Sequence, residues 1–266
     1  MAIPKIIHYC WFGRGPLPED YKRYIESWRK FCPDYEIKEW NEDNFDVECN
    51  EYVKEAYQAR KFAFVSDYAR VCALYDEGGI YLDTDVELLK NLDDLLDNTA
   101  FAGFESNDLI STGFLATEKG GEWVGEIKKL YNGLKFVKED GTYDITTNVE
   151  RISAMTKEKY GLIPQNSYQE LGVVKIFPND YFSPKDWYTG VINKTENSYA
   201  LHHFAASWHS DKEKKKIESY RNRLQRYIDK YGEEKGKLLM LRIDSAKFYL
   251  THPHKIIKKL LTGKRD

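Results

Sequence analysis

The chain has 266 residues, of which 42% are hydrophobic, and a formal net charge of −3 at pH 7. This length can bury one substantial core, and the sequence contains no apolar run of the roughly eighteen residues that a membrane-spanning helix needs. It shows no signal peptide, so we expect a cytoplasmic protein. Its four cysteines include no Cys-x-x-Cys pair, which argues against a zinc site.

The charge and the secondary-structure pattern both change near residue 209. Residues 210–266 hold seventeen Lys or Arg and eight acids, a net charge of +9, which leaves −12 for residues 1–209. Strand and helix patterns alternate in the first part, whereas the sequence from residue 210 to residue 252 is typical of helix. We therefore predict an α/β domain over residues 1–209 and a basic helical extension over residues 210–266. Within the domain, strands are predicted near residues 3–10, 35–40, 79–83, 100–104, 111–117 and 199–205, and helices near residues 19–31, 51–59, 60–76, 121–134 and 146–159.

The first predicted strand ends in an aromatic residue and a glycine. Its sequence, Ile-Pro-Lys-Ile-Ile-His-Tyr-Cys-Trp-Phe-Gly from residue 3, is the apolar run of a strand buried on both faces. Ligand crevices lie at the carboxyl ends of such strands, so Trp11 is a candidate for ligand contact. Trp11 can equally be a core residue.

The predicted helix 60–76 has one apolar stripe and one polar side. Ser66, Asp67 and Arg70 lie on the polar side, and Asp67 and Arg70 share a face because they are three residues apart. The simplest interpretation of this pair is an intrahelical ion pair on the protein surface.

Two carboxylates follow the strand that comes after this helix. Gly78 and Gly79 fit the end of the helix, and the short apolar strand that follows leads to Asp83 and Asp85. In a strand alternate side chains share a face, so Asp83 and Asp85 are expected to point to the same face as Tyr81. Two acids so close repel each other unless a hard cation binds both, so the pattern predicts a divalent metal site.

Two other interpretations of the acidic pair stay open, and a third fails. An isolated Asp-x-Asp is often a solvated acidic turn. Phosphatases of the haloacid-dehalogenase type also carry Asp-x-Asp after an apolar strand, with the first Asp as nucleophile. A calcium loop of EF-hand type would need Gly and Glu where Leu88 and Asp94 stand.

Four motifs occur in order along the chain. They are the first-strand run ending in Trp11-Phe-Gly, then Ser66-Asp67-x-x-Arg70, then Gly-Gly-Ile-Tyr-Leu-Asp-Thr-Asp-Val from residue 78, and His202-His203-Phe-Ala-Ala-Ser207-Trp208. In this order they resemble the DXD-motif sugar transferases of glycosyltransferase family 32. These are bacterial polysaccharide-synthesis enzymes and relatives of yeast mannosyltransferases, and they are distantly similar to the glucosylating domains of clostridial toxins. The resemblance covers residues 3 to about 209.

The resemblance implies a donor site. Trp11 would stack on the base of a nucleotide sugar, with Cys10 beside it. Asp67 and Arg70 would hold hydroxyls of the donor sugar. The other implied donor residues are Ser66 and Tyr81 in the nucleotide pocket, Asp83 at the ribose, and Ser207 and Trp208 at the diphosphate.

The resemblance also implies a metal site. Asp85 would bind the metal directly, Asp83 would contact it, and His203 best fits the place of a third ligand. Whether His202 or His203 is the ligand stays open, because adjacent residues of a strand point to opposite faces. An imidazole among the ligands suits Mn²⁺ better than Mg²⁺.

We therefore predict a GT-A type α/β fold and a metal-dependent, retaining glycosyltransferase, with Asp67, Arg70 and Asp85 as catalytic residues. The donor would be a nucleotide sugar, in the first place a UDP-hexose, and the acceptor a capsular or other polysaccharide or a lipid-linked glycan. The alternatives are a phosphatase of the haloacid-dehalogenase type and a non-catalytic nucleotide-sugar-binding protein. The phosphatase is opposed by the lack of a downstream Gly-Asp-x-x-x-Asp segment.

The end of the chain is basic and amphipathic. Ile and Leu alternate with Lys255, Lys258 and Lys259 up to Leu261. One interpretation is a solvated helix that packs on the domain. The other is a weak peripheral anchor on the inner face of the cell membrane, in which residues 253–266 meet anionic lipid. The basic residues match no nucleic-acid-binding motif, so no nucleic-acid partner is expected.

Overall fold

The computed structural model describes residues 2–187, 189–205, 211–232, 235–236, 238–240 and 242–243. These residues form two compact units. The body consists of residues 2–186 and 191–205, and the C-terminal unit consists of the described residues of 187–190 and from 211 onward. The predicted boundary at residue 209 falls outside the described residues and stays a prediction.

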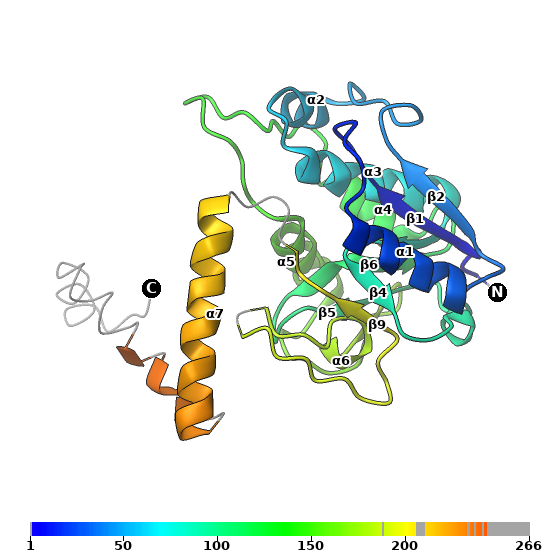
Figure 1. Ribbon diagram of the computed structural model, residues 1–266. Helices are drawn as coiled ribbons and strands as arrows, with labels where there is room; N and C mark the ends of the chain where they lie inside the picture. The colour runs from blue at the N-terminus through cyan, green and yellow to red at the C-terminus, as the bar shows by residue number, and fades with distance from the viewer. Residues whose placement is uncertain are drawn as a thin grey trace. The chain divides into compact units, whose positions relative to one another are not determined.

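The body is built on a seven-stranded mixed sheet with the strand order β2-β1-β3-β6-β5-β8-β7 (Figure 1). Five strands run in one direction, and only β6 and β7 run in the opposite one. The predicted α/β fold class is confirmed by this topology, in which most strands run in one direction, and the GT-A type stays a prediction. The strands are β1 Ile6–Cys10, β2 Glu36–Trp40, β3 Gly79–Leu82, β5 Ala100–Phe104, β6 Ile110–Thr117, β7 Gln169–Glu170 and β8 Lys175–Phe177.

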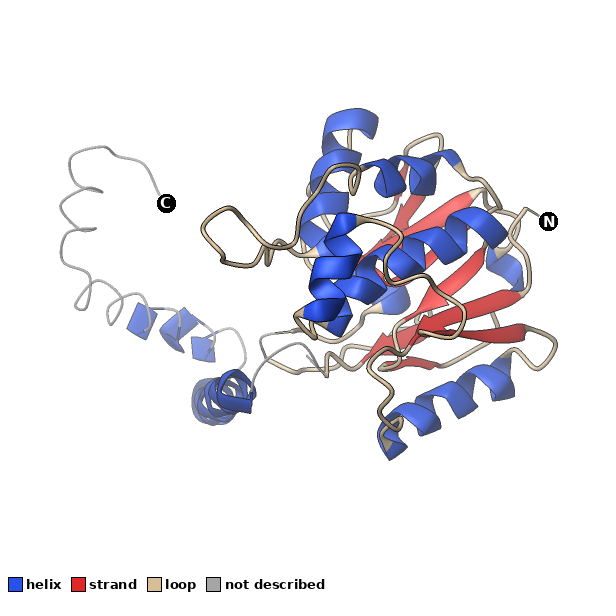
Figure 2. Ribbon diagram, turned by 90° about the horizontal axis from the view of Figure 1, so that it is seen from above, coloured by secondary structure: helices blue, strands red, loops and turns tan. Residues whose placement is uncertain are grey.

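Helices cover both faces of the sheet (Figure 2). On one face, α1 (Glu19–Phe31) is fixed by the fully buried Trp28, whose indole N–H donates to the carbonyl of Val86 at 2.8 Å. The other helices described in the body are α2 Glu51–Gln58, α3 Phe62–Glu77, α4 Glu122–Lys129, α5 Asn148–Tyr160 and α6 Asn179–Phe182, with a 3₁₀ turn at Asp93–Leu95. A second cluster of buried side chains includes residues of α2, α3, α4 and α5, which pack against the other face.

The turn between α3 and β3 directs the chain toward the acidic motif. Gly78 ends α3 at a φ of 73°, a conformation that favours glycine, and its N–H donates to the carbonyl of Leu74 at 2.8 Å. A Cβ atom at Gly79 would lie 2.7 Å from the carbonyl oxygen of Ile6, so β3 approaches β1 closely only because this residue is glycine. The two strands then run in parallel, and β3 ends directly before Asp83.

One edge of the sheet collects the candidate functional residues. Because β1, β3 and β5 run in the same direction, their carboxyl ends meet at this edge, where Trp11, Asp83 and Glu105 follow them. β6 starts at the same edge and contributes Thr112 and Gly113. A separate two-stranded sheet pairs β4 (Val86–Leu88) with β9 (Ala200–His202), the two segments that flank the acids and the histidines.

Several predicted elements differ in extent from the observed ones. The strand predicted near 199–205 spans only Ala200–His202, and the strand predicted near 79–83 stops at Leu82. β4, β7, β8 and α6 were not predicted, and each has four residues or fewer, too few to show a periodic pattern.

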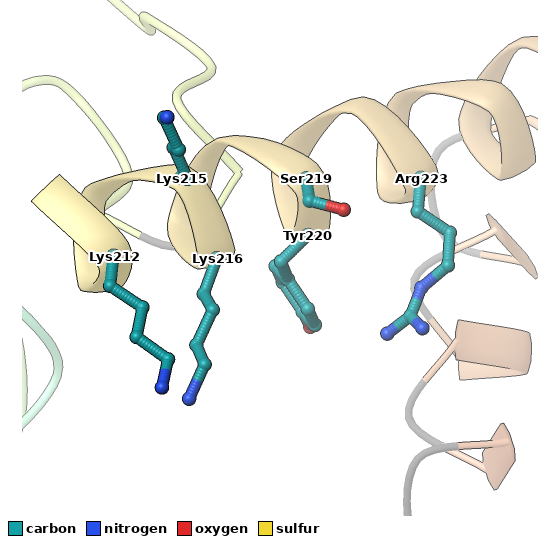
Figure 3. A pocket seen from close by; sticks show the side chains of 6 residues that line it. All are labelled: Lys212, Lys215, Lys216, Ser219, Tyr220 and Arg223. Atoms are coloured by element: carbon teal, nitrogen blue, oxygen red, sulfur yellow. The ribbon is translucent and has the colours of Figure 1, made fainter.

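The C-terminal unit contains α7 (Asp211–Tyr231), which lies where helix was predicted. Its basic side chains Lys212, Lys216 and Arg223 extend to the same side of the helix (Figure 3). Among the helices of the described residues, none combines the length and the apolar character needed to cross a bilayer. The amphipathic segment predicted to contact membranes, residues 253–266, lies outside the described residues.

Candidate active site

The two acids lie in a turn rather than in a strand. The carbonyl of Asp83 accepts a hydrogen bond from the N–H of Val86 at 2.9 Å, and the N–H of Asp83 donates to the carbonyl of Gly113 at 2.9 Å. The carboxylates of Asp83 and Asp85 are therefore not brought together by the alternation of side chains along a strand. The turn brings them together, and one oxygen of each acid belongs to the same cluster of possible metal ligands.

His202 completes this group. One oxygen of each acid and one ring nitrogen of His202 all lie within 4.8 Å of one another. The Nε2 atom of His202 lies 3.2 Å from Oδ1 of Asp85, and the two side chains are only 10% and 12% exposed. The second oxygen of Asp85 accepts a hydrogen bond from the N–H of Ala205 at 2.7 Å.

The family resemblance favours His203 as the third ligand and leaves His202 open; of the two, the structure places His202 beside the acids. His203 points to the other side of the chain, where its Nε2 lies 2.9 Å from a carboxylate oxygen of Glu87 and its ring stacks on Tyr24. The reason is the pairing of β4 with β9, in which Val86 lies opposite His202. Adjacent residues of β9 point to opposite faces, so only one of the two histidines can reach the acids.

The residues of this group fit a divalent cation. Two carboxylates and an imidazole are suitable ligands for Mn²⁺, and the Nδ1 atom of His202 is buried with no hydrogen-bond partner among the described residues. Gly113 leaves room beside them, since a Cβ atom there would lie 3.0 Å from Oδ2 of Asp83 and 3.1 Å from Nδ1 of His202. The predicted metal site therefore has a matching set of donor atoms, with His202 in place of His203.

Charge holds the buried Asp85–His202 pair together. Burial alone would raise the pKa of Asp85 and lower that of His202, because both charged forms lose water. Their mutual attraction outweighs burial, so that the pKa of Asp85 is lowered and that of His202 is raised. A cation between the acids would supply the positive charge that the imidazolium otherwise provides.

Arg70 joins three elements of the site from α3. Its Nη1 donates to the carbonyl of Thr112 at 2.7 Å and lies 3.4 Å from Oδ1 of Asp83, and its Nη2 lies 2.9 Å from Oδ1 of Asp67. The guanidinium also packs over the ring of Tyr81, 4.6 Å from the ring centre. The side chain is 6% exposed, so the interpretation of Asp67 and Arg70 as a surface ion pair does not hold.

Asp67 is the more accessible member of this pair, with 14% of its side chain exposed. Burial raises the pKa of Asp67 to about 6, although the charge of Arg70 acts in the opposite direction. The side-chain amide of Asn148, at the start of α5, lies 3.4 Å from the backbone carbonyl of Asp67. Asp67 is therefore a constrained carboxylate beside the acidic motif, with a pKa raised by its burial.

Three other predicted donor residues lie around Arg70. Tyr81 is fully buried, and its hydroxyl donates to Oδ1 of Asp83 at 2.9 Å, so it orients that acid. Cys10 is buried, and burial raises the pKa of its thiol to about 12. The hydroxyl of Ser66 donates to the carbonyl of Phe62 within α3 at 3.1 Å.

Trp11 lies at the end of β1 and is partly exposed. Its indole N–H donates to the carbonyl of Gly15 at 2.6 Å, and its ring meets Tyr21 edge-on at 5.8 Å. One edge of the indole is thus fixed by its own loop. The two remaining predicted donor residues, Ser207 and Trp208, lie outside the described residues.

Sequence reasoning missed one carboxylate at this edge. Glu105 follows β5, and its N–H donates to the carbonyl of Leu109 at 2.8 Å. Burial raises the pKa of Glu105. The negative charges of Asp83 and Asp85 raise this pKa further, whereas the positive charge of His202 lowers it. The carboxylate of Glu105 is therefore close enough to interact electrostatically with the three clustered residues. No motif marks Glu105 in the sequence; only its place after the predicted strand 100–104 could have indicated it.

Residues 18–102, which include Asp67, Arg70 and both acids, match the family described as "Glycosyltransferase sugar-binding region containing DXD motif". Within these residues the chain is similar to the sugar-binding region of DXD-type glycosyltransferases. This match supports the predicted class of enzyme, and the finer assignment to glycosyltransferase family 32 stays a prediction.

Two relatives match the chain over part of their length. An uncharacterised glycosyltransferase of Acanthamoeba polyphaga mimivirus is 36% identical over 103 residues, which are 35% of this chain and 40% of that protein. Inositol phosphoceramide mannosyltransferase 3 of Schizosaccharomyces pombe is 32% identical over 123 residues, 45% of this chain and 34% of that protein. The chain thus matches at most two fifths of the length of these relatives.

Solved glycosyltransferase structures are also similar to this chain, at low scores. The PaToxG glycosyltransferase gives a TM-score of 0.44 at 18% identity, covering 60% of this chain and 71% of that one. A glycosyltransferase involved in glycosylation of the major capsid of PBCV-1 gives a TM-score of 0.43 at 14% identity, covering 81% of this chain and all of that one.

The two adjacent histidines allow a matched test of the cation site. We expect His202→Ala to lower the affinity for Mn²⁺ by at least about tenfold, since even indirect partners of metal ligands contribute that much. His203→Ala should leave the affinity within about threefold of the wild type. Titration calorimetry with Mn²⁺, on variants whose melting temperatures show that they are folded, checks both. A larger loss with His203→Ala would return the ligand role to His203.

Proposed function

We propose that this chain is a metal-dependent glycosyltransferase that transfers a hexose from a nucleotide sugar, in the first place a UDP-sugar, to a polysaccharide or other glycoconjugate. The observation that carries the proposal is the Asp83–Asp85–His202 group next to the buried Arg70 within the matched DXD region. The acids would hold Mn²⁺ or Mg²⁺, which offsets the charge that develops on the leaving diphosphate. The assignment to family 32 is part of the same proposal.

The chain's own residues supply position and charge. In the proposal, Trp11 stacks on the base, Cys10 and Ser66 lie beneath the nucleotide, and Ser207 and Trp208 reach the diphosphate. Tyr81 and Arg70 fix Asp83, which contacts the ribose and the metal. Asp85 and His202 bind the metal.

Asp67 and Arg70 face the donor sugar in the proposed arrangement. Asp67 accepts hydrogen bonds from sugar hydroxyls, and Arg70 holds Asp67 in place. We infer retention of configuration by front-face attack, in which the departing phosphate takes the proton of the acceptor hydroxyl. In such a reaction, the enzyme acts through orientation and electrostatic stabilisation.

Two relatives are named inositol phosphoceramide mannosyltransferases, which supports a hexose donor and brings mannose into consideration. A cytoplasmic site of action, and weak membrane association through residues 253–266, stay predictions of the sequence. No nucleic-acid partner is proposed.

A donor screen tests the proposal. The full chain is incubated with UDP-glucose, UDP-galactose, UDP-N-acetylglucosamine and GDP-mannose, each with Mn²⁺ and with a chelator. We expect release of nucleoside diphosphate from at least one donor, and its loss with the chelator and with Asp85→Asn. Asp108→Asn, at an exposed acid, is the matched control and should retain activity.

The same screen separates the alternatives. Release of inorganic phosphate would instead indicate a phosphatase, which the family match does not favour. Metal-dependent binding of a nucleotide sugar without turnover, even with glycan acceptors present, would indicate a binding protein.

The second test concerns the donor sugar. We expect Asp67→Asn and Arg70→Lys to lower kcat by about 10²-fold, because each disturbs the orientation of the sugar, while the affinity for UDP stays nearly unchanged. Lysine keeps the charge of Arg70 but lacks the planar set of donors of a guanidinium.

The rate of the wild type should also fall as the pH drops below about 6, because Asp67 then gains a proton and becomes a poorer hydrogen-bond acceptor.

Arg29→Lys is the control for these variants. Arg29 and Glu26 form an exposed pair with the same i,i+3 spacing in α1, so this substitution should leave kcat unchanged. If Arg70→Lys loses UDP affinity in proportion to kcat, the residue does not act on the sugar.

The third test concerns the acceptor. Trp11, the acids and Glu105 follow one another along the sheet edge, from β1 through β3 to β5, so Glu105 lies on the far side of the metal group from the proposed base site. Glu105 is not among the clustered metal ligands of the described residues. We therefore propose that it accepts a hydrogen bond from a hydroxyl of the acceptor.

Glu105→Gln should lower the rate of transfer to a glycan acceptor by about tenfold or more, while donor hydrolysis and Mn²⁺ affinity change little. Asp108→Asn, in the same loop, is again the control. An equal loss of hydrolysis and transfer would place Glu105 at the donor instead.

A further inference from the structure

The loop that follows β1 has an unusual backbone. Gly13 and Arg14 both lie at positive φ, 99° and 59°. Glycine adopts this conformation easily, whereas for arginine it is unfavourable and persists only where neighbouring groups hold the chain. A Cβ atom at Gly13 would lie 2.5 Å from the ring of Phe62, so the loop packs tightly against the start of α3 (Figure 1). We call residues 11–16 the Trp11 loop.

The indole of Trp11 is anchored within this loop. Its N–H donates to the carbonyl of Gly15 at 2.6 Å. The backbone N–H of Trp11 donates to the carbonyl of Trp40 at 2.9 Å, so the start of the loop is fixed to the end of β2. The orientation of the ring then depends on where the loop places Gly15, two residues after Gly13.

The carboxylate of Glu42 holds the middle of the loop. Its Oε1 atom accepts hydrogen bonds from the N–H of Gly13 at 2.7 Å and from the hydroxyl of Tyr57 at 3.1 Å. Its Oε2 atom lies 3.8 Å from Nε of Arg14, which also pairs with the exposed Asp43 at 2.7 Å. One side chain thus contacts both residues at positive φ and connects them to α2, which carries Tyr57.

Glu42 is almost fully enclosed. Only 7% of its side chain is exposed, and its Oε2 atom is buried with no hydrogen-bond partner among the described residues. Burial alone would raise the pKa of Glu42, but the hydrogen bond from the N–H of Gly13 and the charge of Arg14 act against it, so that the pKa is lowered. The side chain is therefore charged at neutral pH. Burying an incompletely paired charge costs stability, so packing alone gives no reason for a carboxylate here.

We propose that Glu42 is a positioning residue for Trp11. It fixes the N–H of Gly13 and, through the loop, the carbonyl of Gly15 that orients the indole, so that the ring is held ready for the base of a nucleotide. This inference rests on the proposed function in assigning Trp11 to the base, whereas the placement of Trp11 by Glu42 does not depend on it. Glu42 itself does not touch the nucleotide, because its carboxylate is buried between the loop and α2.

Nucleotide binding tests this inference on the full chain. We expect Glu42→Ala to weaken the affinity for UDP with Mn²⁺ and to raise the KM of the donor, each by about tenfold, since stacking of a base on an aromatic ring contributes at least about this much. The value of kcat should stay within about threefold of the wild type, because Glu42 acts neither on the sugar nor on the metal.

Two further variants accompany this measurement. Glu42→Gln keeps an oxygen that accepts from Gly13, so it should retain the affinity for UDP within about threefold. Glu48→Ala removes an exposed carboxylate from the same segment and is the matched control, with unchanged affinity expected. Where Glu42→Ala does not fold, Glu42→Asp gives the same readouts, because the shorter side chain cannot reach both Gly13 and Tyr57.

Tryptophan fluorescence without nucleotide reports the position of Trp11 in a separate experiment. Removal of the carboxylate releases the loop, so acrylamide should quench the fluorescence of Glu42→Ala more strongly than that of the wild type. Of the six tryptophans of the chain, only Trp11 lies in the loop, so the difference should disappear when both proteins also carry Trp11→Phe.

Three results would overturn the inference. They are unchanged UDP affinity and quenching in a Glu42→Ala variant that circular dichroism shows to be folded, a loss of affinity as large in Glu42→Gln as in Glu42→Ala, and a quenching difference that persists with Trp11→Phe. If the wild type binds no nucleotide, the proposed function fails, and the fluorescence comparison still decides whether Glu42 positions Trp11.

Discussion

The arrangement of the candidate site depends on the buried guanidinium of Arg70. A buried charge is stable only when its donors are satisfied, and here a carbonyl of β6, Asp67 of α3 and Asp83 after β3 share them. Because one rigid, planar guanidinium makes all of these contacts, it fixes the positions of α3, β3 and β6 relative to one another. Asp83, which also takes the hydroxyl of Tyr81, cannot shift without leaving this cation poorly compensated.

The second half of the site is held by a different charge pair. Asp85 and His202 come from segments 117 residues apart in sequence numbering, and the short β4–β9 sheet brings them to 3.2 Å. Each member would be unfavourable alone at this degree of burial, so the pair keeps the donor atoms assembled when no cation is present. Asp83 and Asp85 thus belong to two separate compensating networks, one on α3 and one on β9, and the turn between them joins the two.

The sequence predicted those parts of the fold that produce long or distinctive patterns. The helix at 19–31 is amphipathic along its full length, and the Gly-Gly step marks the end of α3, so both match the structure. β4 has three residues and leaves no periodic signal, and the sequence does not show that it pairs with the predicted strand near 199–205, although their register decides which histidine faces the acids. The position of Glu105 depends on pairing between distant strands, which a single sequence does not encode locally.

β6 links the two charge networks through consecutive residues. The carbonyl of Thr112 accepts from Arg70, the carbonyl of Gly113 accepts from the N–H of Asp83, and the missing side chain of Gly113 leaves space for His202. A shift of β6 by one residue would turn its side chains to the other face and place Thr112 or Phe114 against the imidazole. The buried residues of β6 oppose such a shift, because Leu115 and Phe114 pack into hydrophobic clusters on opposite faces of the sheet. The register of one buried strand therefore sets the geometry of the site more strictly than the acidic motif itself.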